Sequence, residues 1–148
     1  MLEKLLQTNA DHVCLLLRVV AGVIIFPYGM HKLLGWFDAF GVKETLEDLK
    51  NNKKLPLFIA WLIIIGQSLG SIALILGFLG RIAAAGNFII FTGALIVHSP
   101  DGWMLNWFGK KKGEGIEYFV LLLTLLLVII IKGSGALSVD LWLSNQIR

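Results

Sequence analysis

The longest uninterrupted apolar stretch constrains this chain more than any other feature of its sequence. Residues 55–80 are 26 consecutive positions without a formal charge. The hydrocarbon core of a bilayer is about 30 Å thick, and about 20 helical residues cross it. This stretch therefore predicts a helix that spans a membrane.

Three further apolar stretches, at residues 13–34, 82–99 and 115–131, predict three more spans, so that more than half of the 148 residues lie in lipid. The chain is 57% hydrophobic and 16% charged, whereas a soluble domain carries about a quarter charged residues. Its apolar runs do not alternate as barrel strands do, and helices satisfy their own backbone hydrogen bonds in lipid. The sequence predicts an all-α fold, a single membrane domain over residues 1–148 built as a four-transmembrane-helix bundle.

The two long connections carry signs of the membrane interface. Val42, Leu46 and Leu49 recur at helical spacing among charged residues, which predicts a short interfacial helix between spans one and two. The loop after span three contains Trp103 and Trp107, as aromatic belts do. With four spans both loops share one face, which carries eight basic residues against five on the face of the termini. The positive-inside rule then places the long loops in the cytoplasm. The expected location is the inner cell membrane, as a multi-pass protein.

Several function classes find no support in the sequence. The single cysteine, Cys14, allows neither an intramolecular disulfide nor a thiolate metal site. No metal site is predicted, because the histidines lack local ligand spacing. No basic stripe for nucleic acid, nucleophile elbow or dinucleotide-binding fingerprint is present. Whether the chain is an enzyme stays open.

Small residues mark the predicted helix contacts. Gly66, Gly70 and Gly77 fall on one face of span two, and Gly86 and Gly93 are seven residues apart in span three. Glycines at such spacing allow close approach of helix backbones, so we expect them at packing surfaces, with the wall of a ligand cavity as the alternative.

Polar residues within or beside the spans form the candidate ligand pocket, because each is costly in hydrocarbon without a partner. Four of them reach the long-loop face, and the fifth, Gln67, lies deeper in span two. We expect Glu117 to point inward, toward His98 or Lys32. Interfacial snorkelling is the alternative for the two basic residues of span one. The five pocket candidates are His31, Lys32, Gln67, His98 and Glu117.

Four motifs in this order resemble those of the DoxX family, four-helix membrane proteins related to the small subunit of thiosulfate:quinone oxidoreductase. Residues 16–19 (LLRV) open the first helix, and residues 70–84 (GSIALILGFLGRIAA) are similar to the family's central hairpin. Residues 98–103 (HSPDGW), with GIEY at 115–118, resemble its third loop, and residues 133–140 (GSGALSVD) its closing signature. Family members usually carry a glutamate where Gln67 stands, so a proton relay at that position is not expected here.

The resemblance implies an auxiliary membrane subunit that docks a quinone- or sulfur-linked redox enzyme. No cofactor is predicted for the chain itself, although a bound quinone is compatible with this role. Expected partners are the lipid bilayer, a redox enzyme subunit and further copies of the chain, and no nucleic acid. The alternatives are a small transporter or solute-binding membrane protein, supported by Gln67, His98 and Glu117 on three spans, and a stand-alone membrane oxidoreductase.

Overall fold

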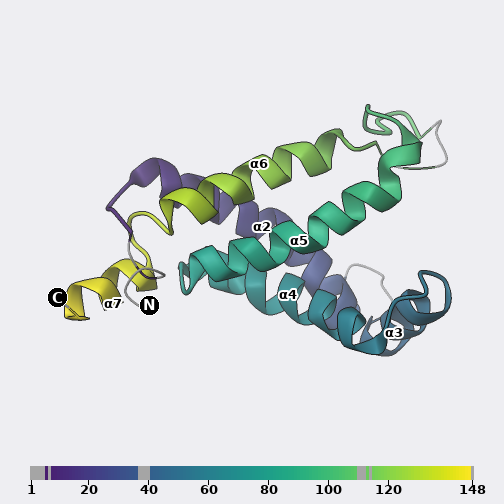
Figure 1. The fold of residues 1–148 in the computed structure, drawn as a ribbon, viewed down its shortest axis with the longest axis horizontal. Coiled ribbons are helices and arrows are strands. Elements are labelled where there is room, and N and C mark those ends of the chain that lie inside the picture. Colours follow the sequence, from purple (N-terminus) through teal and green to yellow (C-terminus); the bar gives the residue numbers. More distant parts are fainter. Residues whose placement is uncertain (1–5, 7, 37–40, 110–112, 114, 148) are drawn as a thin grey trace.

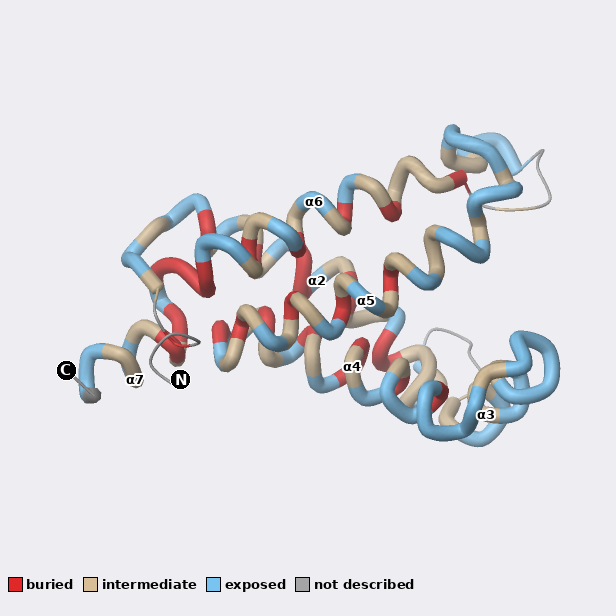
Figure 2. Tube along the Cα trace, viewed as in Figure 1, coloured by how far each residue is buried: buried red, intermediate tan, exposed pale blue. Residues whose placement is uncertain are grey.

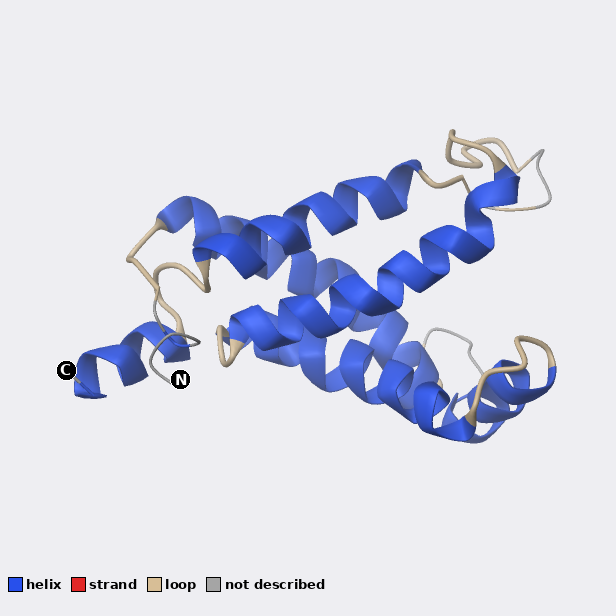
Figure 3. Cartoon of the chain, viewed as in Figure 1, coloured by secondary structure: helices blue, strands red, loops and turns tan. Residues whose placement is uncertain are grey.

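The computed structural model of the chain describes residue 6 and residues 8–36, 41–109, 113 and 115–147. Within these residues the fold is all-helical, with no strand (Figure 3). The described residues form six α-helices and one 3-10 turn. They are α2 (His12–Leu34), α3 (Gly41–Asn51), α4 (Leu57–Leu76), α5 (Gly80–His98), η1 (Ser99–Asp101), α6 (Glu117–Lys132) and α7 (Val139–Ile147).

Capping residues define both ends of α2. The Asp11 carboxylate accepts a hydrogen bond from the Val13 backbone N–H at 2.8 Å, which satisfies a free donor of the first turn. That hydrogen bond, and a weaker one from the Cys14 thiol, holds the pKa of Asp11 below its usual value. At the other end Gly35 adopts the left-handed conformation that ends many helices.

A tight turn joins α4 to α5. Gly77 has a φ of 69° and donates its N–H to the carbonyls of Ala73 and Leu74, which ends α4. Helix α5 begins three residues later, at Gly80. The uninterrupted apolar stretch of the sequence therefore ends in a helical hairpin and not in one long helix.

Four long helices run lengthwise beside one another (Figure 1). Helix α2 packs along α4, α4 along α5, and α5 along α6. The two termini and α7 lie at one end of the molecule, whereas α3 and the loop after α5 lie at the other. Buried positions follow the inner sides of the long helices, while α3 has none (Figure 2). The core consists of Ala21, Ile25, Leu74, Ala84, Phe91, Phe119, Leu122, Leu126 and Ile129.

Three of the long helices are long and apolar enough to cross a membrane. They are His12–Leu34, Leu57–Leu76 and the segment Gly80–Asp101. Helix α6 has 16 residues and is about 24 Å long at 1.5 Å per residue, shorter than the hydrocarbon core. Four spans are therefore not established by length alone. Large apolar side chains such as Ile89 and Leu121 are exposed in the middle of the helices, where lipid is the compatible surrounding.

Candidate functional site

A fully buried arginine lies at the end of the bundle that holds the termini. Arg18 of α2 is completely shielded from solvent, and a guanidinium group has five N–H donors to satisfy. All five are used, by backbone carbonyls from the last turn of α4 and from the loop after α6. Nε donates to Ser134 (2.8 Å), Nη1 to Leu74 and Ile75 (2.9 and 2.6 Å), and Nη2 to Ala136 and Leu137 (3.2 Å each).

Asp140 provides the opposite charge in the same region. Its buried carboxylate accepts hydrogen bonds from the backbone N–H groups of Leu79 (2.7 Å) and Gly80 (2.9 Å), and from the Ser134 hydroxyl. A helix carries partial positive charge at its N-terminus and partial negative charge at its C-terminus. The carboxylate thus stabilises the start of α5, and the guanidinium stabilises the end of α4.

We call Arg18, Ser134 and Asp140 the polar junction. Because its donors are fully used by the protein itself, Arg18 holds α2, α4 and the segment after α6 together and has no donor left for a ligand. Gly77 belongs to this region, since a Cβ there would lie 2.7 Å from Arg18 Nη1 and 2.5 Å from Ser138 Cβ. The junction was not predicted from the sequence, although an arginine in an apolar span requires a partner and Asp140 is the acid of the closing motif.

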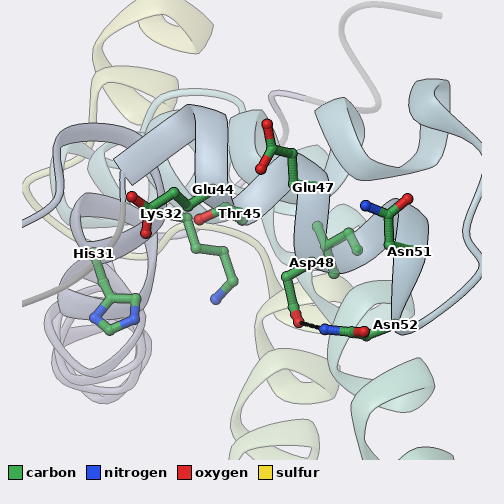
Figure 4. A pocket seen from close by; sticks show the side chains of 9 residues that line it. His31, Lys32, Glu44, Thr45, Glu47, Asp48, Asn51 and Asn52 are labelled. Atoms are coloured by element: carbon green, nitrogen blue, oxygen red, sulfur yellow. Dashed lines mark hydrogen bonds between the residues drawn. The ribbon is translucent and has the colours of Figure 1, made fainter.

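A hollow lies at the opposite end of the bundle, between the last turn of α2 and the length of α3. Its volume is about 730 Å³. Two of the five predicted pocket residues, His31 and Lys32, line it from α2. Figure 4 shows Lys32 between His31 and the hydrogen-bonded pair of Asp48 and Asn52. The α3 lining consists of Glu44, Thr45, Glu47, Asp48, Leu49, Asn51 and Asn52.

His98 and Glu117 lie elsewhere at this end, where the α5–α6 loop begins and ends. His98 Nδ1 is 2.8 Å from Asp101 Oδ2, and its ring stacks on Phe119 at 5.5 Å between centroids. The Glu117 carboxylate accepts a hydrogen bond from the Leu105 N–H at 3.4 Å. It is therefore engaged by the loop and not by His98 or Lys32, since the loop folds back over the start of α6.

Gln67 occupies the interior of the bundle. It lies ten residues into α4, about 15 Å from the end of the helix, and its side chain is 4% exposed. Within the described residues its carboxamide oxygen accepts no hydrogen bond. The Oδ1 atom of buried Asn87 in α5 likewise accepts no hydrogen bond from the described residues. Its Nδ2 donates to the carbonyls of Gly66 and Ala83 at 2.9 and 3.0 Å. The five predicted residues are thus distributed over three places, and their joint role in ligand binding stays a prediction.

The predicted packing glycines fall into two groups. A Cβ at Gly66 would lie 2.6 Å from Ile90 Cδ1, and one at Gly70 would lie 2.6 Å from Asn87 Nδ2, so both face α5. By contrast, a Cβ at Gly86 or Gly93 would meet nothing within 4 Å. Those two glycines lie on the outer face of α5, where no other described helix covers them.

The chain matches the model of a known protein family. The family model DoxX covers residues 13–99, more than half of the chain. The chain belongs to the DoxX family. Together with its apolar helices, this makes it a membrane protein. No curated protein and no solved structure matches it.

The DoxX match includes α2, α3, α4 and α5 but ends before α6. Arg18 and all the residues that line the hollow therefore lie within the matched residues, whereas Ser134 and Asp140 lie beyond them. Over the described ranges of this DoxX protein, no group of three histidine, cysteine or acidic side chains could hold a metal ion.

Proposed function

We propose that this DoxX protein is an auxiliary subunit of the inner cell membrane that crosses the bilayer four times and docks a quinone- or sulfur-linked redox enzyme. The redox character of the partner comes from the family resemblance. The place of docking is the long-loop end, which extends well beyond a minimal connection between helices. It carries Trp36, which is exposed, and the aromatic loop after α5.

The fourth crossing is supported by the composition and surroundings of α6. Between Glu117 and Lys132 the helix carries no charged residue, and exposed Leu121 and Ile131 give it an apolar outer surface. It runs beside α5 from the long-loop end to the end that holds the termini (Figure 1). A helix somewhat shorter than the hydrocarbon core is accommodated by local thinning of the bilayer or by snorkelling of flanking residues.

One observation carries the docking proposal: the loop after α5 displays bulky apolar side chains that its own fold does not cover. Trp107 is 77% exposed and Phe108 is 86% exposed. Aromatic anchors of this kind dominate the energy of many protein interfaces. The lysines at 110–112 would add positive charge beside them, although they lie outside the described residues.

Co-purification in mild detergent with mass spectrometry tests this proposal, using the double variant Trp107→Ser/Phe108→Ser. We expect the native chain to recover an oxidoreductase subunit, and the double variant to recover about tenfold less of it or lower. The matched control is Trp142→Ser, because Trp142 is 61% exposed on α7 at the other end of the molecule. Recovery of a bare homo-oligomer, or equal losses in both variants, would contradict the proposal.

No second function is proposed. The transporter alternative depends on Gln67, His98 and Glu117 lining one path, whereas the latter two are held by Asp101 and by Leu105. Self-association stays a prediction, and the mass of the purified detergent complex measures it.

A further inference from the structure

The two walls of the hollow carry opposite charges. The α2 wall presents Lys32 and His31, and the α3 wall presents the carboxylates of Glu44, Glu47 and Asp48. All of these side chains border the same space of about 730 Å³ (Figure 4). The arrangement is bipolar, with a basic side and an acidic side.

The opposite charges do not meet across this space. Lys32 Nζ donates to the Tyr28 carbonyl at 3.4 Å and lies 5.8 Å from the centre of the Tyr28 ring. Asp48 accepts a hydrogen bond from the Asn52 amide at 2.7 Å. Among the described residues, neither Lys32 nor any carboxylate of the α3 wall forms an ion pair within 4 Å. A bridging molecule with a negative and a positive group would pair both walls at once.

The hollow lies at the depth of lipid headgroups. Lys32 is in the last turn of the membrane-spanning helix α2. Helix α3 is amphipathic, with half-buried Val42, Leu46 and Leu49 and with exposed carboxylates that border the hollow. Such helices lie in the plane of the membrane interface. Helix α4 packs beside α3, and its first turns expose Phe58 and Trp61. Lipid acyl chains could lie against these two side chains.

We propose that the hollow binds the phosphoethanolamine headgroup of a membrane phospholipid. The phosphate pairs with Lys32, assisted by His31, and the primary ammonium group donates its hydrogen bonds to Glu44 and Glu47. A choline headgroup carries no N–H donor for the carboxylates. A glycerol headgroup carries no cation, so the carboxylates of the acidic wall would stay without a positive partner. This site is independent of the proposed docking of a redox enzyme.

Thermal unfolding of the purified full chain in detergent, with native mass spectrometry, tests the site. The probes are phosphatidylethanolamine, phosphatidylcholine and phosphatidylglycerol with identical acyl chains, and glycerophosphoethanolamine as the headgroup without tails. We expect phosphatidylethanolamine to raise the melting temperature and to be retained, with at least tenfold tighter apparent binding than the other two lipids. The tail-less compound should bind more weakly, because it lacks the apolar contacts.

Variants assign the effect to the two walls. Lys32→Met and Glu44→Gln/Glu47→Gln should each lose about tenfold in apparent affinity, whereas Lys43→Met should bind as the native chain does, because Lys43 is exposed on α3 but does not line the hollow. The acidic-wall variant changes only exposed side chains, so it tests the site even if Lys32→Met fails to fold. Equal binding of all three lipids, or an unchanged preference in Glu44→Gln/Glu47→Gln, would overturn the proposal. Equal affinity for the tail-less compound would reassign the site to a soluble phosphoethanolamine and overturn the lipid assignment.

Discussion

At the scale of single residues, the polar junction explains how an arginine is tolerated inside an apolar bundle. A charged side chain in hydrocarbon is costly, and burial of an ion is favourable only with excellent geometry and complete hydrogen bonding. Arg18 meets both conditions through five carbonyl acceptors, with Asp140 as the nearby negative charge. The carbonyls at the end of α4 add the negative pole of a helix.

Removal of this guanidinium is predicted to destabilise the fold strongly. Arg18→Met should lower the unfolding free energy by about 3–5 kcal/mol, because buried polar partners are left unpaired. Arg18→Lys should lower the unfolding free energy by less than Arg18→Met does, since an ammonium group offers three donors but not the planar, five-donor geometry of a guanidinium. The control is Lys132→Met, an exposed basic residue near the same end of the bundle, with an expected effect of about 0–1 kcal/mol. Melting temperatures in detergent check the order, and equal losses for Arg18→Met and Lys132→Met would contradict the structural role.

The sequence allows some of these residue contacts to be predicted and conceals others. Arg18 is visible in the sequence as a charge within a span, and such a charge requires polar partners. The sequence does not show that these partners are backbone carbonyls. The partner of Glu117 is different, because the Leu105 N–H is a backbone group brought there by a loop. Loop conformation depends on many weak contacts, so neither composition nor spacing indicates such a partner.

At the scale of helices, the length of the apolar stretches predicts where helices form, and turn chemistry decides where they end. Residues 13–34 coincide closely with α2. The stretch 55–80 contains the shorter helix α4, because Gly77 terminates it and starts the hairpin. The glycine spacing is less informative about packing. Gly70 in α4 and Gly77 at its C-terminal cap are seven residues apart, and a Cβ at either would meet a neighbouring segment, whereas the same spacing of Gly86 and Gly93 in α5 falls on an open face.

That difference between faces gives a prediction for glycine substitutions. A Cβ at Gly29 of α2 would lie 2.5 Å from the Gln67 carbonyl oxygen and 2.6 Å from Ser68 Cα, which are backbone atoms that cannot move aside easily. Gly29→Ala should therefore destabilise the fold by about 1–3 kcal/mol, as overpacked cores do. Gly86→Ala meets nothing within 4 Å and should leave stability equal or slightly higher, because alanine favours helix. A melting temperature lowered more by Gly86→Ala than by Gly29→Ala would contradict the packing of α2 on α4.

At the scale of the whole molecule, the polar junction and the hollow lie at opposite ends of one bundle. The junction fixes the end of α4 and the start of α5 against the segment after α6. The opposite, long-loop end carries exposed aromatic and charged groups. Structural and recognition features are thus separated along the axis that we propose to cross the membrane. This separation requires that α6 crosses the membrane, from the side of the long loops to the side on which α2 begins.

Cysteine labelling from the two sides of the membrane tests that requirement most directly. The background is Cys14→Ala, which removes the single native thiol, and the reporters are the exposed positions Lys50→Cys, Phe108→Cys and Asn145→Cys. A membrane-impermeant reagent should label Asn145→Cys in intact cells, and should label the other two only after the membrane is opened. Labelling of Phe108→Cys and Asn145→Cys from the same side would show that α6 does not cross the membrane, and would contradict the four-span account.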